Sequence, residues 1–118
     1  MGLRNTSHYI RNVLKRATKE YSGSDAPSPG DEIIITIEEH AKVTNFLFIM
    51  NLNGATCDVE IKKQIRTEDA QFEIELTEIF TNVSELEYHN DKGYNYFKIR
   101  FYNFSATADL YWAYVMHF

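Results

Sequence analysis

The feature that most constrains this chain is an alternation of apolar and polar side chains, with a period of two, that begins at residue 32. Successive side chains of a β-strand point to opposite faces, so this period predicts strands with one buried face. Both prolines of the chain lie before residue 32, which agrees, because proline removes a hydrogen-bond donor from a sheet. The alternation is clearest in three sets: Ile33, Ile35 and Ile37; Cys57, Val59 and Ile61; Phe97, Ile99 and Phe101.

The spacing of turn signals after residue 32 indicates how the strands are arranged. Asn53-Gly54 favours a tight hairpin, since both residues tolerate positive φ, and Asn90-Asp91-Lys92-Gly93 is typical of a turn. We count six or seven strands at roughly ten-residue spacing, which predicts an antiparallel β-sandwich of the jelly-roll or Ig-like kind. The aromatic content of 14% supports a mainly β fold.

Two segments are apolar in both phases of the alternation. Residues 43–52 form a nearly continuous apolar run, which predicts a central strand covered on both faces. Residues 110–116 are also apolar in both phases, and here we expect one face of the strand to meet a partner.

The first part of the chain has a different pattern. Residues 7–21 carry apolar side chains at helical spacing and begin at Ser7, a good N-cap, so they predict a short amphipathic α-helix. Residues 22–31 are rich in serine, glycine and proline, as in a linker. The chain is therefore interpreted as a basic helical arm (1–24), a linker (25–31) and a sandwich domain (32–118).

Charge is distributed unevenly between these parts. Residues 1–24 hold five basic residues and one acidic residue (+4), whereas residues 25–118 hold seven and sixteen (−9). The arm is either a solvated basic helix or a segment attracted to the acidic face of a neighbouring copy. The apolar side of the predicted helix lacks Trp and Phe, which argues against membrane binding. The acidic remainder of the chain argues against specific nucleic-acid binding. We expect docking on a protein through Ile10, Val13 and Leu14, with Arg11 and Lys15 meeting acidic surface.

No catalytic or cofactor-binding motif is present. The sequence lacks a phosphate-binding loop, a nucleophile elbow and a paired-histidine zinc motif. Cys57 is in phase with Val59 and Ile61, so it is interpreted as a buried side chain and not as a nucleophile. One cysteine and no apolar run of about 20 residues fit a protein made in a cytoplasm without a membrane span. We expect no enzyme activity, no cofactor and no metal.

Aromatic residues are dense in the last third of the chain. Tyr102 shares the polar phase with Lys98 and Arg100, so we expect it to be exposed, and Tyr111 and Trp112 lie in the segment that is apolar in both phases. Such side chains serve as interface anchors or as platforms that stack on sugar rings. The alternative is that most of them pack inside the sandwich.

Residues 96–108, Tyr-Phe-Lys-Ile-Arg-Phe-Tyr-Asn-Phe-Ser-Ala-Thr-Ala, are followed by an aromatic strand. This pattern resembles the closing hairpin of small β-sandwich proteins in tailed-bacteriophage particles. The resemblance implies a virion component, such as a head-decoration, neck or tail-associated protein, made in the host cytoplasm and without catalytic residues. The arm and linker have no counterpart in it.

The sequence therefore predicts a non-enzymatic structural protein that forms a homo-oligomer or joins a larger particle. The alternative function is that of a carbohydrate-binding β-sandwich module.

Overall fold

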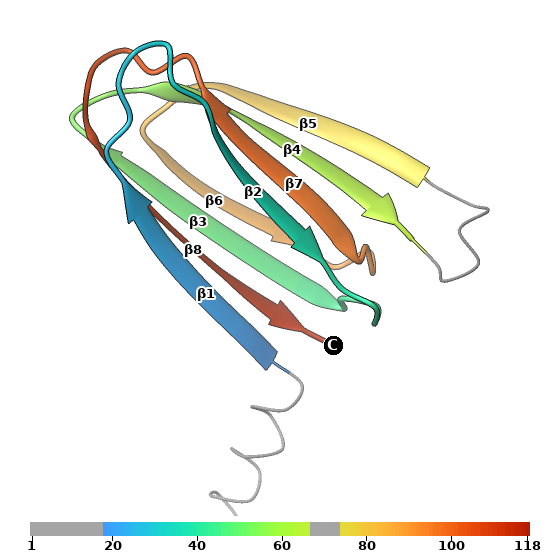
Figure 1. The fold of residues 1–118 in the computed structure, drawn as a ribbon. Coiled ribbons are helices and arrows are strands. Elements are labelled where there is room, and N and C mark those ends of the chain that lie inside the picture. Colours follow the sequence, from blue (N-terminus) through green and yellow to red (C-terminus); the bar gives the residue numbers. More distant parts are fainter. Residues whose placement is uncertain (1–17, 67–73) are drawn as a thin grey trace, which may run out of the picture.

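The computed structural model describes residues 18–66 and 74–118, which form two four-stranded antiparallel sheets packed face to face (Figure 1). Sheet A has the strand order β1 (Thr18–Asp25), β8 (Asp109–His117), β3 (Asn45–Asn53) and β6 (Glu85–Asn90). Sheet B has the order β2 (Ile33–Glu38), β7 (Tyr96–Tyr102), β4 (Cys57–Ile65) and β5 (Ile74–Val83). The predicted mainly β sandwich is confirmed. No helix among the described residues is long and apolar enough to span a bilayer.

The chain crosses between the sheets at almost every connection. Only β4 and β5 are consecutive neighbours in one sheet, and the orders 1-8-3-6 and 2-7-4-5 give the connectivity of an eight-stranded jelly roll. The hairpins predicted at Asn53-Gly54 and within residues 96–118 are therefore wrong. Gly54 does adopt a positive φ of 86°, but its turn leads from sheet A to sheet B, and β7 and β8 likewise belong to different sheets.

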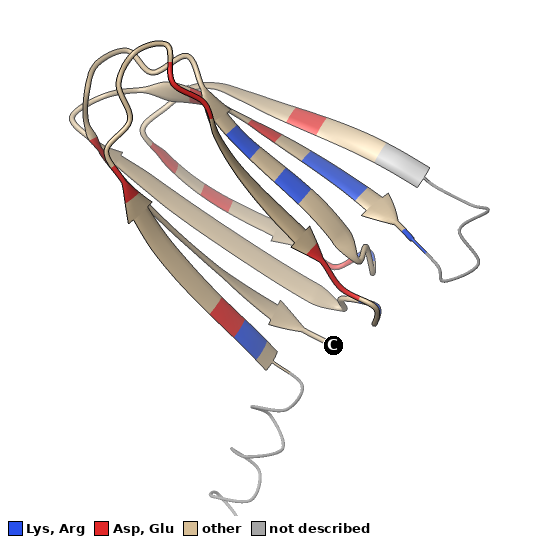
Figure 2. Ribbon diagram, in the orientation of Figure 1, with Lys and Arg blue, Asp and Glu red and all other residues tan. Residues whose placement is uncertain are grey.

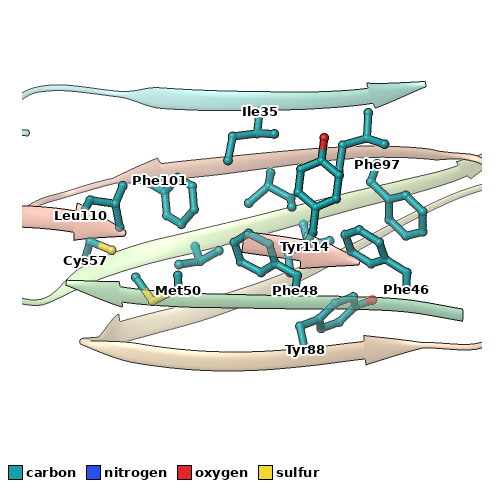
Figure 3. Packing of buried hydrophobic residues seen from close by; sticks show 14 of the residues in the cluster. Ile35, Phe46, Phe48, Met50, Cys57, Tyr88, Phe97, Phe101, Leu110 and Tyr114 are labelled. Atoms are coloured by element: carbon teal, nitrogen blue, oxygen red, sulfur yellow. The ribbon is translucent and has the colours of Figure 1, made fainter. Parts of the chain in front are cut away.

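The interior is formed by the inner faces of the two sheets (Figure 3). Phe46 of β3 stacks against Phe97 of β7 with ring centroids 4.0 Å apart, and the Phe48 ring is tilted against that of Phe101, with centroids 5.9 Å apart. All four rings are fully buried. Burying a phenylalanine side chain contributes roughly 1.5–3 kcal/mol, so these contacts between sheets are a main source of stability.

Residues 18–25 form a strand, which corrects two predictions. They pair with β8 from Thr18↔His117 to Asp25↔Leu110. The predicted helix over 7–21 is therefore wrong for residues 18–21, and the sandwich begins at Thr18 and not at residue 32. Tertiary contacts outweigh local propensity here, because the Tyr21 ring packs 5.2 Å from that of Tyr114.

The remaining part of the predicted arm lies outside the described residues. This part is residues 1–17, and it includes the predicted docking residues Ile10, Arg11, Val13, Leu14 and Lys15.

Gly23 allows Trp112 to lie against β1. The two residues are register partners in sheet A, and a Cβ atom on Gly23 would come within 2.3 Å of Trp112 Cζ2. The glycine that suggested a linker is thus a packing requirement, since a close approach to backbone is a common reason for glycine inside a strand.

We predict that Gly23→Ala destabilises the protein by about 1–3 kcal/mol, because the added methyl group displaces the indole ring. Denaturant unfolding measures the change, and the fluorescence of Trp112, the one tryptophan of the chain, should shift. Ser24→Ala is the matched control, since Ser24 is exposed on the same strand. Equal stabilities of the two variants would contradict the packing argument.

Candidate functional site on the outer face of sheet A

The outer face of sheet B is a charged surface whose groups pair with one another. Arg100 of β7 lies 3.2 Å from Glu32 and 3.8 Å from Glu60 of β4. Its guanidinium group also lies over the Tyr102 ring, 4.0 Å from the centroid. Two exposed apolar side chains also lie on this face, Ile34 (46% exposed) and Ile79 (56%), but each stands beside a member of these ion pairs, Ile34 next to Arg100 and Ile79 next to Glu60.

The outer face of sheet A is very different, because its two central strands are almost free of charge. β3 has no charged residue and β8 has only Asp109; in Figure 2 the β3 ribbon carries neither blue nor red. Half of the outward side chains of these strands are apolar, and they lie next to one another. We call them the apolar stripe: Leu47 (36% exposed), Ile49 (47%) and Tyr111 (52%), with the half-buried Ala113 and Val115.

The register places these side chains next to one another. Leu47 pairs with Val115 and Ile49 with Ala113, so the apolar stripe is continuous across β3 and β8. The prediction that residues 43–52 are covered on both faces is wrong, since the burial of β3 alternates strictly and its odd-numbered residues face outward. The surplus of apolar side chains that suggested two covered faces lies instead on an open surface.

A shallow hollow of about 490 Å³ lies beside the apolar stripe. It is lined from the outer face by Ile49 and Asn51 of β3, Tyr111 and Ala113 of β8, and Glu85 and Glu87 of β6. Asn51 Nδ2 donates a hydrogen bond of 3.1 Å to Glu85 Oε1. We call Glu85 and Glu87 the acidic rim.

Within the described part of the chain, the acidic rim has no partner of opposite charge. The ion pairs found within residues 18–66 and 74–118 do not involve Glu85 or Glu87. The strands of sheet A hold one basic residue, Lys19, and five acidic residues, some of which are visible as red bands on β1 and β6 in Figure 2. Lys19 is itself held by Glu39 at 2.9 Å. The hollow therefore combines apolar surface with uncompensated negative charge.

The three aromatic residues predicted to bind a partner do not come together. Tyr111 lies on the apolar stripe, as expected. Tyr102 lies on the outer face of sheet B, half-buried, with one ring face covered by Arg100. Trp112 points inward, packs against the core and stacks with Tyr114 at 5.9 Å.

Sequence reasoning missed the acidic rim and a polar cluster inside the sandwich. Lys63 is buried and its Nζ donates to Tyr88 Oη at 2.9 Å, with Glu78 at 3.5 Å and the Tyr94 ring at 5.3 Å. Burial favours a lower pKa for Lys63, but the hydrogen bond to Tyr88 and the charge of Glu78 outweigh it and raise the pKa. Lys63 is thus a charged amine and not the neutral one that a nucleophilic lysine requires. The sequence signal for this cluster was the pair Lys62-Lys63. Adjacent side chains of a strand point to opposite faces, so one of the two lysines must point into the sandwich.

Cys57 is fully buried, as predicted. Burial, with a smaller effect of the neighbouring Asp58 charge, raises the pKa of its thiol to about 11. A reactive cysteine needs a thiolate near neutral pH, so Cys57 is a packing residue. Among the described residues, no three His, Cys, Asp or Glu side chains are grouped as a metal site would require.

We predict that the Cys57 thiol reacts with a disulfide reagent at pH 8 at least about a hundredfold more slowly in the folded protein than in denaturant. Raising the pKa from 9.0 to about 11 lowers the thiolate fraction by about that factor, and burial slows the reaction further. Comparable rates in the two states, measured by absorbance, would show that this end of the core opens readily.

Comparisons with known proteins identify no family. No family model and no curated protein matches the chain. A subunit of the Bacillus endospore appendages, described as disulfide-linked pili, is 9% identical over 85% of each chain, with a TM-score of 0.48. The SPBc2 prophage-derived protein YomS is 10% identical over 84% of this chain and 93% of that one, with a TM-score of 0.46. A family 16 carbohydrate-binding module is 15% identical over 72% and 68%, with a TM-score of 0.37. Similarities at this level do not assign a function.

Proposed function

We propose that this protein is a non-enzymatic structural protein that assembles with copies of itself through the outer face of sheet A. The observation that carries the proposal is the apolar stripe on β3 and β8, whose largest members are a third to a half exposed. Contiguous apolar surface on a soluble domain usually marks an interaction site. An exposed tyrosine at its edge suits an anchor, because tyrosine is enriched among residues that dominate binding energy.

The surroundings of the apolar stripe support this proposal. The centre of the sheet lacks charge while its edge strand β6 carries the acidic rim, and an apolar centre with a polar border is the usual anatomy of a protein interface. On the opposite face the exposed Ile34 and Ile79 stand beside the paired charges of Arg100 and Glu60, so that face has no charge-free centre.

Within this proposal, the assembly is a virion. The support is the order of residue types over residues 96–108 and in the aromatic strand that follows, which resembles β-sandwich proteins of tailed-bacteriophage particles. The resemblance is one of sequence pattern alone, because β7 and β8 belong to different sheets and form no hairpin. A head-decoration, neck or tail-associated protein is made in the host cytoplasm and functions by binding other subunits. Such a task needs an adhesive surface and no catalytic group.

We predict that Ile49→Lys weakens self-association by about tenfold or more, because it places a charge in the centre of the apolar interface. Sedimentation velocity over a concentration series measures the effect. The matched control is Ile34→Lys: Ile34 is 46% exposed, against 47% for Ile49, but lies on β2 of sheet B. A wild-type protein that stays monomeric at all concentrations, or equal effects of the two substitutions, would contradict the proposal.

Carbohydrate binding is a second candidate function, favoured by the composition of the hollow. Tyr111 offers an exposed ring, and Glu85, Glu87 and Asn51 place carboxylates and an amide beside it. Rings that stack on sugars and polar groups that bind hydroxyls are the two elements of a sugar site. The inward orientation of Trp112 leaves Tyr111 as its single outward aromatic residue.

If the hollow binds sugars, a glycan screen on the wild-type protein gives a hit that Tyr111→Ala abolishes and Tyr102→Ala leaves unchanged. Tyr102 is the control because it lies on the other sheet beneath Arg100. A screen without hits eliminates this candidate, whereas a hit on a protein that remains monomeric would favour it over assembly.

A further inference from the structure

We propose that the hollow and apolar stripe of one copy receive residues 1–17 of a second copy, so that the chains join head to tail. This inference rests on the proposed function, because it names the occupant of the surface through which the protein assembles. Three observations carry it: charge complementarity, the pattern of apolar residues in the segment, and the opposite ends of sheet A at which Thr18 and the hollow lie.

The charges of the two parts are opposite. Residues 1–17 contain four basic residues and no acidic one: Arg4, Arg11, Lys15 and Arg16. Residues 18–118 contain the other eight basic residues and all seventeen acidic ones, a balance of −9. The acidic rim of the hollow lacks a basic partner within the described part of the chain. A basic segment therefore has a place at which it neutralises carboxylates that the sandwich leaves unpaired.

The apolar parts match as well. Ile10, Val13 and Leu14 recur at the spacing that places side chains on one side of a helix, and Arg11 and Lys15 lie next to them in sequence. The hollow offers Ile49, Tyr111 and Ala113 to apolar groups and the two glutamates of β6 to basic groups. An amphipathic segment laid in a groove with charges at its edge is a common mode of peptide recognition.

The positions of the segment and the hollow favour a second copy over the chain's own segment. Residues 1–17 join the sandwich at Thr18, which pairs with His117 at one end of sheet A. The hollow lies toward the opposite end, where Tyr111 pairs with Ser24, six residues along β1, or about 20 Å away. To fill its own hollow, the segment must reverse direction at Thr18 and cover that distance. A second copy whose hollow lies next to Thr18 of the first copy receives the segment without such a reversal.

A contact of this kind is heterologous, since the two surfaces that meet are different. The assembly as a whole then keeps one free segment at one end and one free hollow at the other after any number of additions, so it grows into a filament or closes into a ring. At low ionic strength it should be strongest, because the charges are exposed and salt screens them.

The test uses charge reversal in the full-length chain. The arm variant carries Arg11→Glu with Lys15→Glu, and the rim variant carries Glu85→Lys with Glu87→Lys. We expect each variant alone to associate at least tenfold more weakly than the wild type in sedimentation velocity at low salt. An equimolar mixture should recover association, since the rim variant retains a native segment and the arm variant a native hollow. A chain carrying all four substitutions should also associate.

Other outcomes overturn the inference in distinguishable ways. If the arm variant associates like the wild type while Ile49→Lys does not, the surface is an interface but residues 1–17 do not occupy it. If the mixture stays dissociated, the segment does not act between copies. A wild-type chain that is monomeric at low salt overturns both this inference and the proposed function. Unchanged thermal unfolding of the rim variant serves as the folding control, because Glu85 and Glu87 are exposed.

Discussion

A strand in a two-layered sandwich can bury the side chains of only one of its faces, since the other face has no layer to cover it. In β3 the inward positions are filled by Phe46, Phe48, Met50 and Leu52, all of them buried. The outward positions 47 and 49 are also apolar, and the fold provides nothing to cover them. An apolar side chain left there gives up roughly 1–3 kcal/mol of burial, so the surface that carries Leu47 and Ile49 gains stability from a partner that covers it.

The same constraint explains what could be predicted from the sequence. Where one phase is apolar and the other polar, as in β4 and β7, the buried face followed directly from the alternation, and Cys57, Val59, Ile61, Phe97, Ile99 and Phe101 are all fully buried. Where both phases are apolar, as in β3, two arrangements fit the sequence equally well. Either both faces are covered within the domain, or one face is covered and the other is open to a partner. Tyr111 faces outward, as expected for β8. Trp112 was also expected to meet a partner but faces the core, because neighbouring side chains of a strand point to opposite faces.

Connectivity could not be predicted for a different reason. A turn residue such as Gly54 fixes the local bend of the backbone, and its positive φ is the one expected. Whether the next strand pairs with the previous one or crosses to the other sheet depends on long-range pairing that a turn does not encode. β1 was missed because Tyr21 fits a helical stripe and Gly23 a linker equally well; only their contacts with Tyr114 and Trp112 on β8 show that they belong to a strand.

The distribution of charge separates the two faces as clearly as the distribution of apolar side chains. On sheet B both arginines are held by their neighbours: Arg100 lies between Glu32 and Glu60 and over Tyr102, and Arg66, just after β4, covers the Tyr96 ring. Even the buried Lys63 is matched by Tyr88 and Glu78. On sheet A the carboxylates of Glu85 and Glu87 have no cationic partner among the described residues, so negative charge lies at the edge of the apolar stripe.

Two copies that simply packed their apolar stripes together would bring two acidic rims into one interface. Like charges within a low-dielectric interface oppose association, and the sandwich has no free cation on sheet A to offset them, since Lys19 is held by Glu39. A two-fold dimer through this face therefore gains apolar contact but adds charge repulsion. A basic segment from a neighbour supplies both apolar side chains and the missing positive charge. The charge-free centre, the acidic edge and the basic sequence that precedes Thr18 thus favour an unsymmetrical contact over a symmetrical one.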